Sequence, residues 1–204
     1  MARRRVYIVD DEEPIRRSAS LLLKVAGLDA HAFDSGKALL AVADALLPGA
    51  ILLDMRMPDL DGIEVQRALR ERNAPHPVII MTGHGDVQAA VSAFESGAVA
   101  FVEKPFSKAR LLEILDVAFM KIEDPKGFAA RSSEAEMRIA ALGAVEQELL
   151  ERLMQGRSSA EVGVELGLAA AEVEARRARL FEQLGVDSVT GALNVAFAAR
   201  LAIR

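Results

Sequence analysis

Polar side chains follow four of the short apolar runs in the first half of the chain. The runs end at Asp10 and Asp11, at Asp54, at Thr82 and at Lys104. If these runs are parallel strands, their carboxyl ends share one edge of a sheet, where α/β proteins bind ligands. The sequence therefore predicts that three carboxylates, one hydroxyl and one ammonium group converge in one crevice.

Three carboxylates so close together repel one another, and the pKa of at least one would rise unless a cation lies between them. Mg²⁺ suits this group, because it prefers oxygen ligands from one or two carboxylates, water and phosphate. A carboxylate beside Mg²⁺ can attack a phosphoryl group and form an acyl phosphate. The ammonium of Lys104, the hydroxyl of Thr82 and nearby backbone N–H groups suit the phosphoryl oxygens. The pattern therefore indicates phosphoryl transfer to a carboxylate.

Each of these residues has a simpler interpretation when it is taken alone. Asp11 could cap the first helix, and Asp61 is expected to cap the third. Lys104 alone would be a solvated charge, Thr82 a turn residue and Asp54 an ordinary carboxylate at a strand end. Only their joint occurrence at successive strand ends favours a functional site.

The elements that must position these side chains alternate between apolar runs and amphipathic stretches. Strands are expected at 6–9, 30–33, 51–53, 78–81 and 99–102, and helices at 14–26, 37–45, 63–69, 87–94 and 109–122. Continuous apolar strands imply a parallel sheet that is covered on both faces. We therefore expect an α/β fold, a doubly wound sheet of five parallel strands in the order 2-1-3-4-5. In that order the first and third strands are neighbours.

A charged stretch with proline and glycine, Glu123–Gly127, interrupts this alternation and indicates a linker that we extend to about Ser133. We expect a first domain at 1–122, a partly helical linker at 123–141 and a second domain at 142–204. The second domain is expected to be a small all-α domain of four helices, at 142–154, 158–166, 171–184 and 188–202. A short helix between two glycines, followed by a longer helix with arginines, has the spacing of a helix-turn-helix.

Composition excludes several classes of function. The formal net charge is -5, so the whole chain shows no bias towards polyanions, and without cysteine it has no disulfides or thiolate zinc sites. We expect no membrane span or secretion signal, because no 18-residue apolar run occurs and the basic start leads into acidic residues. The absence of cysteine is compatible with a reducing cytoplasm, where we expect the protein. After residue 133 there is no His, Cys, Lys or Tyr, so an output enzyme is not expected.

Roughly residues 4–122 resemble the CheY-like receiver family in five motifs that fall in order. The matching stretches are Val9-Asp10-Asp11, Asp54-Met55-Arg56-Met57-Pro58, Asp61-Gly62, Met81-Thr82-Gly83 and Lys104-Pro105-Phe106. The resemblance implies that Asp54 is phosphorylated by a partner histidine kinase. It implies Mg²⁺ held by Asp10, Asp11, Asp54 and the backbone carbonyl of Arg56. It also implies a cis peptide before Pro105, and no enzymatic activity beyond Mg²⁺-dependent phosphorylation and dephosphorylation of Asp54.

The same resemblance implies a switch. Phosphate on Asp54 would attract Thr82, and the vacated space would let Phe101 turn inward. Phe101 could instead be an ordinary core aromatic, and Arg56 could either shape the lifetime of the phosphoryl group or pair with a surface carboxylate. The face built from the fourth helix, fifth strand and fifth helix, about 87–122, would change shape. We expect the chain to form a homodimer on that face after phosphorylation.

Residues 142–203 resemble the four-helix output domain of the NarL/FixJ (LuxR-type) regulators. The matching positions are Gly156-Arg157-Ser158, Glu161-Val162, Glu165-Leu166-Gly167-Leu168, Val173, Arg177 and Leu184-Gly185-Val186, and the receiver stretch 82–87 also looks FixJ-like. This family places its third helix in the major groove of DNA. The resemblance therefore implies DNA contacts from Arg176, Arg177 and Arg179.

The departures from this family concern residues that would face phosphates. The family usually has Asn-Lys at Ser159-Ala160, Thr at Glu172 and Lys at Gln183. From 134 to 204 there are 8 Arg and no Lys against 11 Asp and Glu, a net charge of −3. DNA affinity depends largely on neutralised phosphates. Two hypotheses therefore stay open, a DNA-binding transcriptional regulator and a protein-interaction module that no longer binds DNA. In the second, the arginines pair with glutamates along their own helix.

Overall fold

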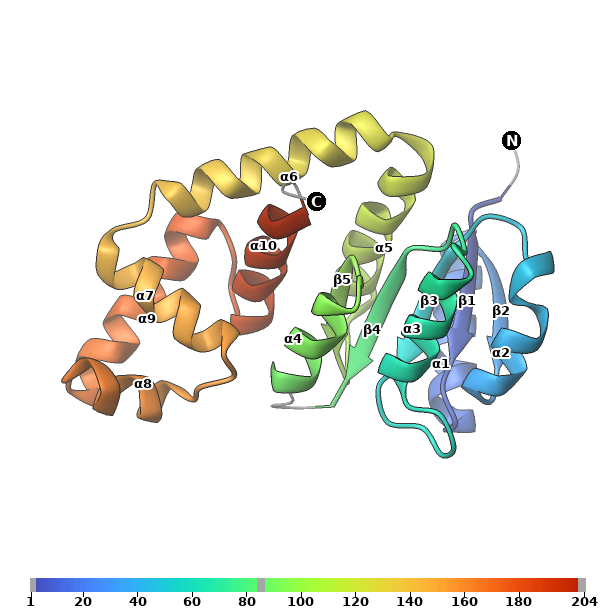
Figure 1. Ribbon diagram of the computed structural model, residues 1–204, viewed down its shortest axis with the longest axis horizontal. Coiled ribbons are helices and arrows are strands. Elements are labelled where there is room, and N and C mark those ends of the chain that lie inside the picture. The colour runs from blue at the N-terminus through green and yellow to red at the C-terminus, as the bar shows by residue number, and fades with distance from the viewer. Residues whose placement is uncertain (1–2, 84–86, 202–204) are drawn as a thin grey trace. The chain divides into compact units, whose positions relative to one another are not determined.

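A computed structural model describes residues 3–83 and 87–201, except for the side chains of 87–90 and 201 (Figure 1). The chain divides into two compact units, Met1–His84 with Ser92–Pro125, and Gly85–Val91 with Lys126–Arg204. Parts of the FixJ-like stretch 82–87 and of the expected last helix lie outside the described residues. No helix in the described ranges is long and apolar enough to cross a membrane.

The first unit is built on one sheet whose five strands are all parallel. The strands are β1 (Arg5–Val9), β2 (Asp29–Phe33), β3 (Ala50–Asp54), β4 (Val78–Thr82) and β5 (Ala100–Glu103). Their order, β2-β1-β3-β4-β5, confirms the expected topology. Every residue of β3 and β4 is buried, as expected for apolar strands that are covered on both faces.

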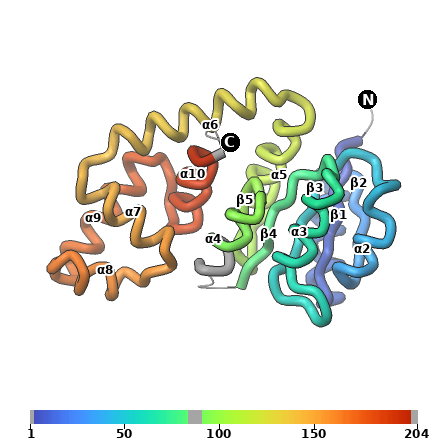
Figure 2. The backbone as a smooth tube through the Cα atoms, in the orientation of Figure 1, coloured from blue at the N-terminus to red at the C-terminus, as the bar shows by residue number. Residues whose placement is uncertain are grey.

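Helices cover both faces of this sheet, with α1 and α5 against one face and α2 and α3 over the other (Figures 1 and 2). The helices are α1 (Glu13–Val25), α2 (Gly36–Val42), α3 (Gly62–Glu71), α4 (Val87–Glu95) and α5 (Lys108–Glu123). The expected helix at 37–45 is shorter, because a 3-10 turn, η1 (Ala43–Ala45), follows α2.

Two capping expectations have different outcomes. Asp61 caps α3 as predicted, because its carboxylate accepts the Glu64 N–H at 2.8 Å while Glu64 accepts the Asp61 N–H at 2.9 Å. Asp11 does not cap α1, whose N-cap position is held by Glu12 without a side-chain hydrogen bond. The carboxylate of Asp11 is therefore not committed to helix capping.

Gly62 lets α3 begin directly against the end of β3. The Gly62 N–H donates to the carbonyl oxygen of Met55 at 3.0 Å. A Cβ atom at this position would lie 2.6 Å from the carbonyl oxygen of Asp54 and 3.0 Å from the Cα atom of Met55. Both neighbours are backbone atoms, so a side chain would displace the strand end that carries Asp54.

The described residues of the second unit form helices joined by short turns, and they include Val87–Val91, the first part of α4. The unit also contains α6 (Pro125–Ala140), α7 (Ala144–Met154), α8 (Ser159–Leu166), α9 (Ala170–Leu184) and α10 (Val189–Leu201). Ser158 and Glu161 form the expected capping box on α8. Gly167 (φ 66°) and Gly185 (φ 65°) end α8 and α9 in the left-handed conformation that glycine adopts readily.

The stretch from Glu123 to about Ser133, expected as part of a partly helical linker, is helical except at one residue. Only Asp124 is non-helical between α5 and α6, with φ −140° and ψ 74°. Pro125 then opens α6, because the first turn of a helix needs no N–H from proline. Of the residues that indicated a linker, Glu123 ends α5 and Asp124 lies between the helices, whereas Pro125, Lys126 and Gly127 lie in the first turn of α6, a helix of 16 residues.

A buried ion pair joins α7 to α9 in the second unit. Glu146 is only 3% exposed, and its Oε1 atom lies 3.1 Å from Nη1 of Arg176. The Nε atom of Arg179 lies 4.0 Å from the same oxygen. Burial opposes the charge of Glu146, but the hydrogen bond from Arg176, a backbone hydrogen bond and the charges of Arg176 and Arg179 together outweigh it and hold the pKa of Glu146 below its usual range.

Replacing Gly62 by alanine should destabilise the first unit by about 1–3 kcal/mol, because the added Cβ overlaps backbone atoms. Urea unfolding of the full chain, followed by circular dichroism, measures the change. Gly83→Ala is the matched control, since a Cβ there meets nothing within 4 Å, and it should cost less than about 0.5 kcal/mol. Equal costs at the two positions would contradict the role given to Gly62.

Glu146→Gln should destabilise the full chain at neutral pH by about 1–3 kcal/mol, because it removes the charged partner of Arg176. A carboxylate with a lowered folded-state pKa stabilises the fold above its unfolded pKa, and this stabilisation disappears as pH falls through the folded-state value. The difference in free energy of unfolding between wild type and variant, measured with urea, should therefore decrease as the solution is acidified below pH ~4. Glu151→Gln, an exposed site on α7, is the control, and a gap that is constant with pH would refute this account.

Candidate functional site

The predicted polar side chains meet at the carboxyl edge of the sheet. Because β1 and β3 are neighbours, carboxylate oxygens of Asp10, Asp11 and Asp54 lie within 4.8 Å of one another. Asp10 and Asp54 are buried, whereas Asp11 is exposed at the mouth of the cluster. The expected convergence of three carboxylates is thus confirmed.

Lys104 joins the two buried carboxylates. It follows β5, and its Nζ atom lies 2.6 Å from Oδ2 of Asp10 and 2.6 Å from Oδ1 of Asp54. Its backbone N–H donates to the carbonyl oxygen of Thr82 at 2.7 Å, and the Lys104–Pro105 peptide is cis, as expected. Burial opposes the charge of Lys104, but the two carboxylates outweigh it and raise the pKa of the ammonium group.

One ammonium group does not neutralise this cluster. Burial raises the pKa of Asp54 above its ordinary range and the nearby charge of Asp10 adds to the effect, while Lys104 and the Arg56 N–H only partly offset it. The site therefore favours a further positive charge, and three carboxylates at this spacing are a donor set that suits Mg²⁺.

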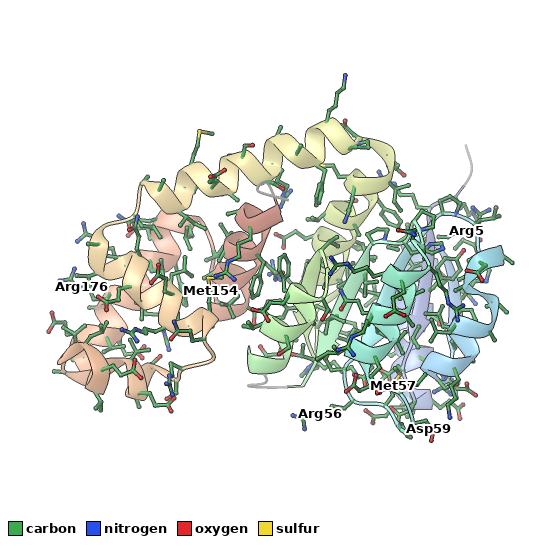
Figure 3. The ribbon with its side chains drawn as sticks, in the orientation of Figure 1. Arg5, Arg56, Met57, Asp59, Met154 and Arg176 are labelled. Carbon is green, nitrogen blue, oxygen red and sulfur yellow. The ribbon has the colours of Figure 1, made fainter. Side chains whose placement is uncertain are left out.

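The turn after β3 wraps around the carboxylate of Asp54. The Arg56 N–H donates to Oδ2 of Asp54 at 3.1 Å, and Arg56, Met57 and Asp59 lie along this turn (Figure 3). Because Lys104 holds Oδ1 and Arg56 holds Oδ2, the plane of the carboxylate is fixed by its two neighbours. The use of the Arg56 carbonyl as a metal ligand stays a prediction.

The two expected switch residues are both buried. The hydroxyl of Thr82 donates to the carbonyl oxygen of Gly83 at 3.1 Å. Phe101 is only 4% exposed on β5, so its ring already lies inward here. An inward turn of Phe101 would have to start from a different arrangement, and its switch role stays a prediction.

Arg16 is a member of the site that the sequence did not reveal. Its Nη1 atom donates to the backbone carbonyl oxygen of Asp10 at 2.8 Å, across the turn between β1 and α1. The only signal in the sequence is an arginine five residues after Asp11, at the end of the first turn of the expected helix. Helical periodicity alone does not tell which of Arg16 and Arg17 faces the sheet.

The arginines proposed for DNA contact on α9 are engaged within the second unit. Arg176, which is labelled in Figure 3, pairs with Glu146 through Nη1. Its Nη2 atom also lies 3.9 Å from Oε1 of Glu172. Arg177 lies 2.8 Å from Glu174, and it also donates to the hydroxyl of Ser159 on α8 at 3.0 Å. The alternative in which arginines pair with glutamates along their own helix is thus seen for Arg176 and Arg177.

The outer face of α9 carries small and acidic side chains. The exposed positions of this helix are Ala170, Ala171, Glu172, Glu174, Ala175, Ala178, Arg179, Glu182 and Gln183. Arg179 is the exposed cation among them, with a side chain that is 63% exposed. Ala169, at the N-cap of α9, provides no side-chain cap.

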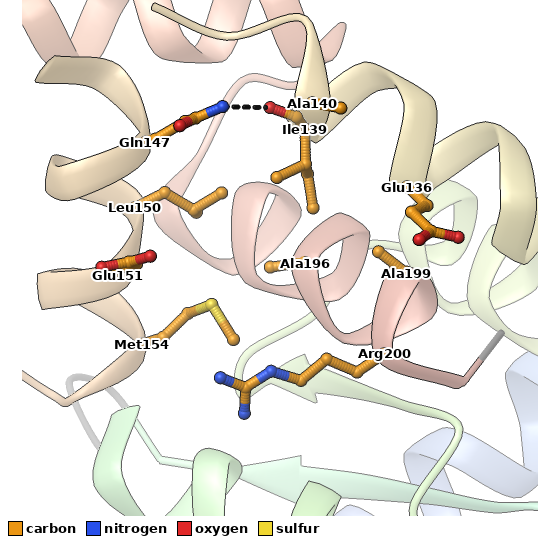
Figure 4. Close-up of a pocket in the computed structure, with 10 residues that line it drawn as sticks. All are labelled: Glu136, Ile139, Ala140, Gln147, Leu150, Glu151, Met154, Ala196, Ala199 and Arg200. Carbon is orange, nitrogen blue, oxygen red and sulfur yellow. Dashed lines mark hydrogen bonds between the residues drawn. The ribbon is translucent and has the colours of Figure 1, made fainter. Parts of the chain in front are cut away.

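A shallow pocket of about 350 Å³ lies among α6, α7 and α10 (Figure 4). Its lining is mainly apolar, with Glu136, Glu151 and Arg200 at its edges. Gln147 on α7 donates to the carbonyl oxygen of Ile139 on α6 at 3.2 Å beside it. Nothing in the sequence pattern predicted this pocket.

Comparisons with known proteins cover nearly the whole chain. Residues 6–116 match the family model of the response regulator receiver domain, and residues 140–196 match that of the bacterial regulatory proteins of the luxR family. The transcriptional regulatory protein FixJ of Bradyrhizobium diazoefficiens is 34% identical, over 95% of each chain. The response regulator protein TmoT of Ectopseudomonas mendocina is 33% identical over 93% of this chain and 86% of its own length.

Solved structures agree with these relatives. Full-length FixJ from B. japonicum superimposes with a TM-score of 0.60 at 32% identity, and the match covers 98% of this chain and 99% of that one. The N-terminal part of FixJ is 41% identical with a TM-score of 0.55, over 57% of this chain and 93% of its own. The chain therefore belongs to the two-component response regulators that control transcription, with a receiver domain joined to a LuxR-type helix-turn-helix domain.

Proposed function

We propose that Asp54 is the phosphoacceptor of this regulator and that a partner histidine kinase supplies the phosphoryl group. The observation that carries this proposal is the ammonium of Lys104, which lies 2.6 Å from the carboxylates of both Asp10 and Asp54. Among the three clustered carboxylates, Asp54 is the one that both Lys104 and the Arg56 N–H orient.

In the reaction, one carboxylate oxygen of Asp54 attacks the phosphorus atom of the donor phosphohistidine. The bond from phosphorus to the imidazole nitrogen breaks, and its electron pair stays on that nitrogen. Lys104 then changes partners, from the carboxylate to an oxygen of the new acyl phosphate. Hydrolysis returns inorganic phosphate and the free carboxylate, so the chain acts on its own side chain rather than on a released substrate.

The cofactor of this reaction is Mg²⁺, and the donor set of the site fits it. Asp10, Asp11, Asp54 and the backbone carbonyl of Arg56 would hold the ion. When bound, Mg²⁺ supplies positive charge that offsets the carboxylates and the incoming phosphoryl oxygens. Asp11 is exposed, which leaves the cluster open to solvent on its side.

The signal then passes from the receiver to the output domain. The hydroxyl of Thr82 turns from Gly83 to the phosphoryl group, and Phe101 repacks behind it. The face of α4, β5 and α5, about 87–122, then forms the homodimer interface. The receiver occupies 1–122, a partly helical linker 123–141 and the output domain 142–204. The end of α5 at Glu123 and the span of α6 support this division.

In the output domain we propose that α9 contacts DNA, with Arg179 as its exposed cation. A second candidate function is protein interaction without DNA binding. It is favoured by the ion pairs of Arg176 and Arg177 with glutamates, because a guanidinium group committed to a carboxylate neutralises no phosphate.

Acetyl phosphate with Mg²⁺ should form a labile adduct on the full chain, detected by intact mass spectrometry. The adduct should disappear in Asp54→Asn, because an amide cannot act as the carboxylate nucleophile. Asp61→Asn is the matched control and should keep the adduct, since asparagine also caps helices. An adduct that survives in Asp54→Asn would refute the assignment.

Titration of the phosphorylated full chain with duplex DNA at two salt concentrations should show binding that weakens as salt rises. Arg179→Ala should weaken this binding and reduce the slope of log affinity against log salt concentration by about 1, the value expected for the loss of one phosphate contact. Arg176→Ala is the comparison, and its main effect should be on stability because it removes the nearer partner of the buried Glu146 and leaves only Arg179 at 4.0 Å. No salt-dependent binding by the phosphorylated wild type would favour the protein-interaction function instead.

A further inference from the structure

The turn between β1 and α1 carries the paired aspartates and is held in an unusual way. No side chain caps α1. Instead, Oδ1 of Asp10 accepts the N–H of the N-cap residue Glu12 at 2.9 Å. The helix then begins with its first regular hydrogen bond, from the Arg16 N–H to the carbonyl oxygen of Glu12 at 3.1 Å. The first turn of the helix is thus tied to the carboxylate cluster rather than to a cap.

The side chain of Arg16 adds a second tie across the same turn. Its Nη1 atom donates to the carbonyl oxygen of Asp10 at 2.8 Å, in a partly buried position. That oxygen belongs to the peptide group that joins Asp10 to Asp11. The backbone N–H of Asp10 donates to Phe33 on β2 at 3.3 Å, so Asp10 is held on both of its sides.

Asp11 has no comparable support of its own. Its carboxylate is exposed, and it has no hydrogen bond or ion pair within the described part of the chain. Its place within 4.8 Å of the other carboxylates is therefore set by its backbone. The hydrogen bond from Arg16 fixes the orientation of the peptide group from which that backbone continues.

We propose that Arg16 is a positioning residue for the metal site and holds the 10–11 peptide so that the Asp11 carboxylate faces the cluster. The inference rests on the proposed phosphoacceptor function and extends it to a residue outside the donor set. Partners that orient metal ligands from behind typically contribute about 10- to 100-fold to metal affinity.

The positive charge of Arg16 acts in the opposite direction, because it repels a cation in the cluster. Arg16 is only partly buried, so solvent and salt screen this repulsion. Arg17 separates the two effects. It carries the same charge on the next residue, but its side chain is 81% exposed and lies 4.0 Å from Glu13, without a bond to the turn.

The test compares Arg16→Met, Arg16→Lys and Arg17→Met in the full chain. Calorimetric titration measures Mg²⁺ binding to the unphosphorylated protein, and acetyl phosphate labelling gives the half-saturating Mg²⁺ concentration and the maximum rate. Arg16→Met should raise the dissociation constant and the half-saturating concentration about tenfold, with the maximum rate nearly unchanged. Arg17→Met should leave both close to wild type, and Arg16→Lys should recover part of the loss.

Equal Mg²⁺ affinity in Arg16→Met and Arg17→Met, or tighter binding in Arg16→Met, would overturn the positioning role. If Arg16→Met does not fold, as judged by circular dichroism, the Mg²⁺ affinity of Arg16→Lys is the deciding measurement. It keeps the charge but not the planar fork of donors, and affinity equal to wild type would then overturn the proposal. A wild-type chain that binds Mg²⁺ but takes no phosphoryl group on Asp54 would refute the proposed function and leave the positioning role standing.

Discussion

One ammonium group shared between two strands is the interaction on which the receiver unit depends. Lys104 follows β5, yet its Nζ atom lies 2.6 Å from carboxylates that belong to β1 and β3. Without this cation, Asp10 and Asp54 would be two buried negative charges in contact. The same pairing leaves the cluster short of positive charge, so the arrangement that stabilises the edge of the sheet also prepares it for a divalent cation.

The backbone around this ion pair leaves little freedom. Gly62 allows α3 to begin against the carbonyl oxygen of Asp54, and the Arg56 N–H holds the second oxygen of its carboxylate. On the opposite side, Arg16 holds the carbonyl oxygen of Asp10. The reactive carboxylate therefore sits between turns that are fixed by backbone contacts, which is how a site becomes organised before its ligand arrives.

The output unit depends on a different ion pair, with a different consequence. Glu146 is buried, and removing Arg176 would leave its charge between α7 and α9 with only the more distant Arg179 to compensate it. Arg176 is therefore held by the fold of its own unit. Arg177 is held in a similar way by Glu174 and Ser159. The helix-turn-helix keeps its architecture, while two of its three candidate DNA contacts serve internal packing.

The sequence by itself determined the order of elements, the parallel sheet and the residues at its carboxyl edge, because apolar periodicity and strand-end polar residues are local signals. For Glu123–Ser133 proline and glycine indicated a linker but not how much of it is helical, because the first turn of α6 tolerates proline. Only the tertiary structure decided that Lys104 bridges Asp10 and Asp54, that Arg16 rather than Arg17 reaches Asp10, and that Arg176 turns to Glu146. The contacts of Lys104 and Arg176 join segments far apart in the chain, which no local pattern encodes. Arg16 lies only six residues from Asp10, but which of the two neighbouring arginines reaches it depends on the face of α1 that packs against the sheet.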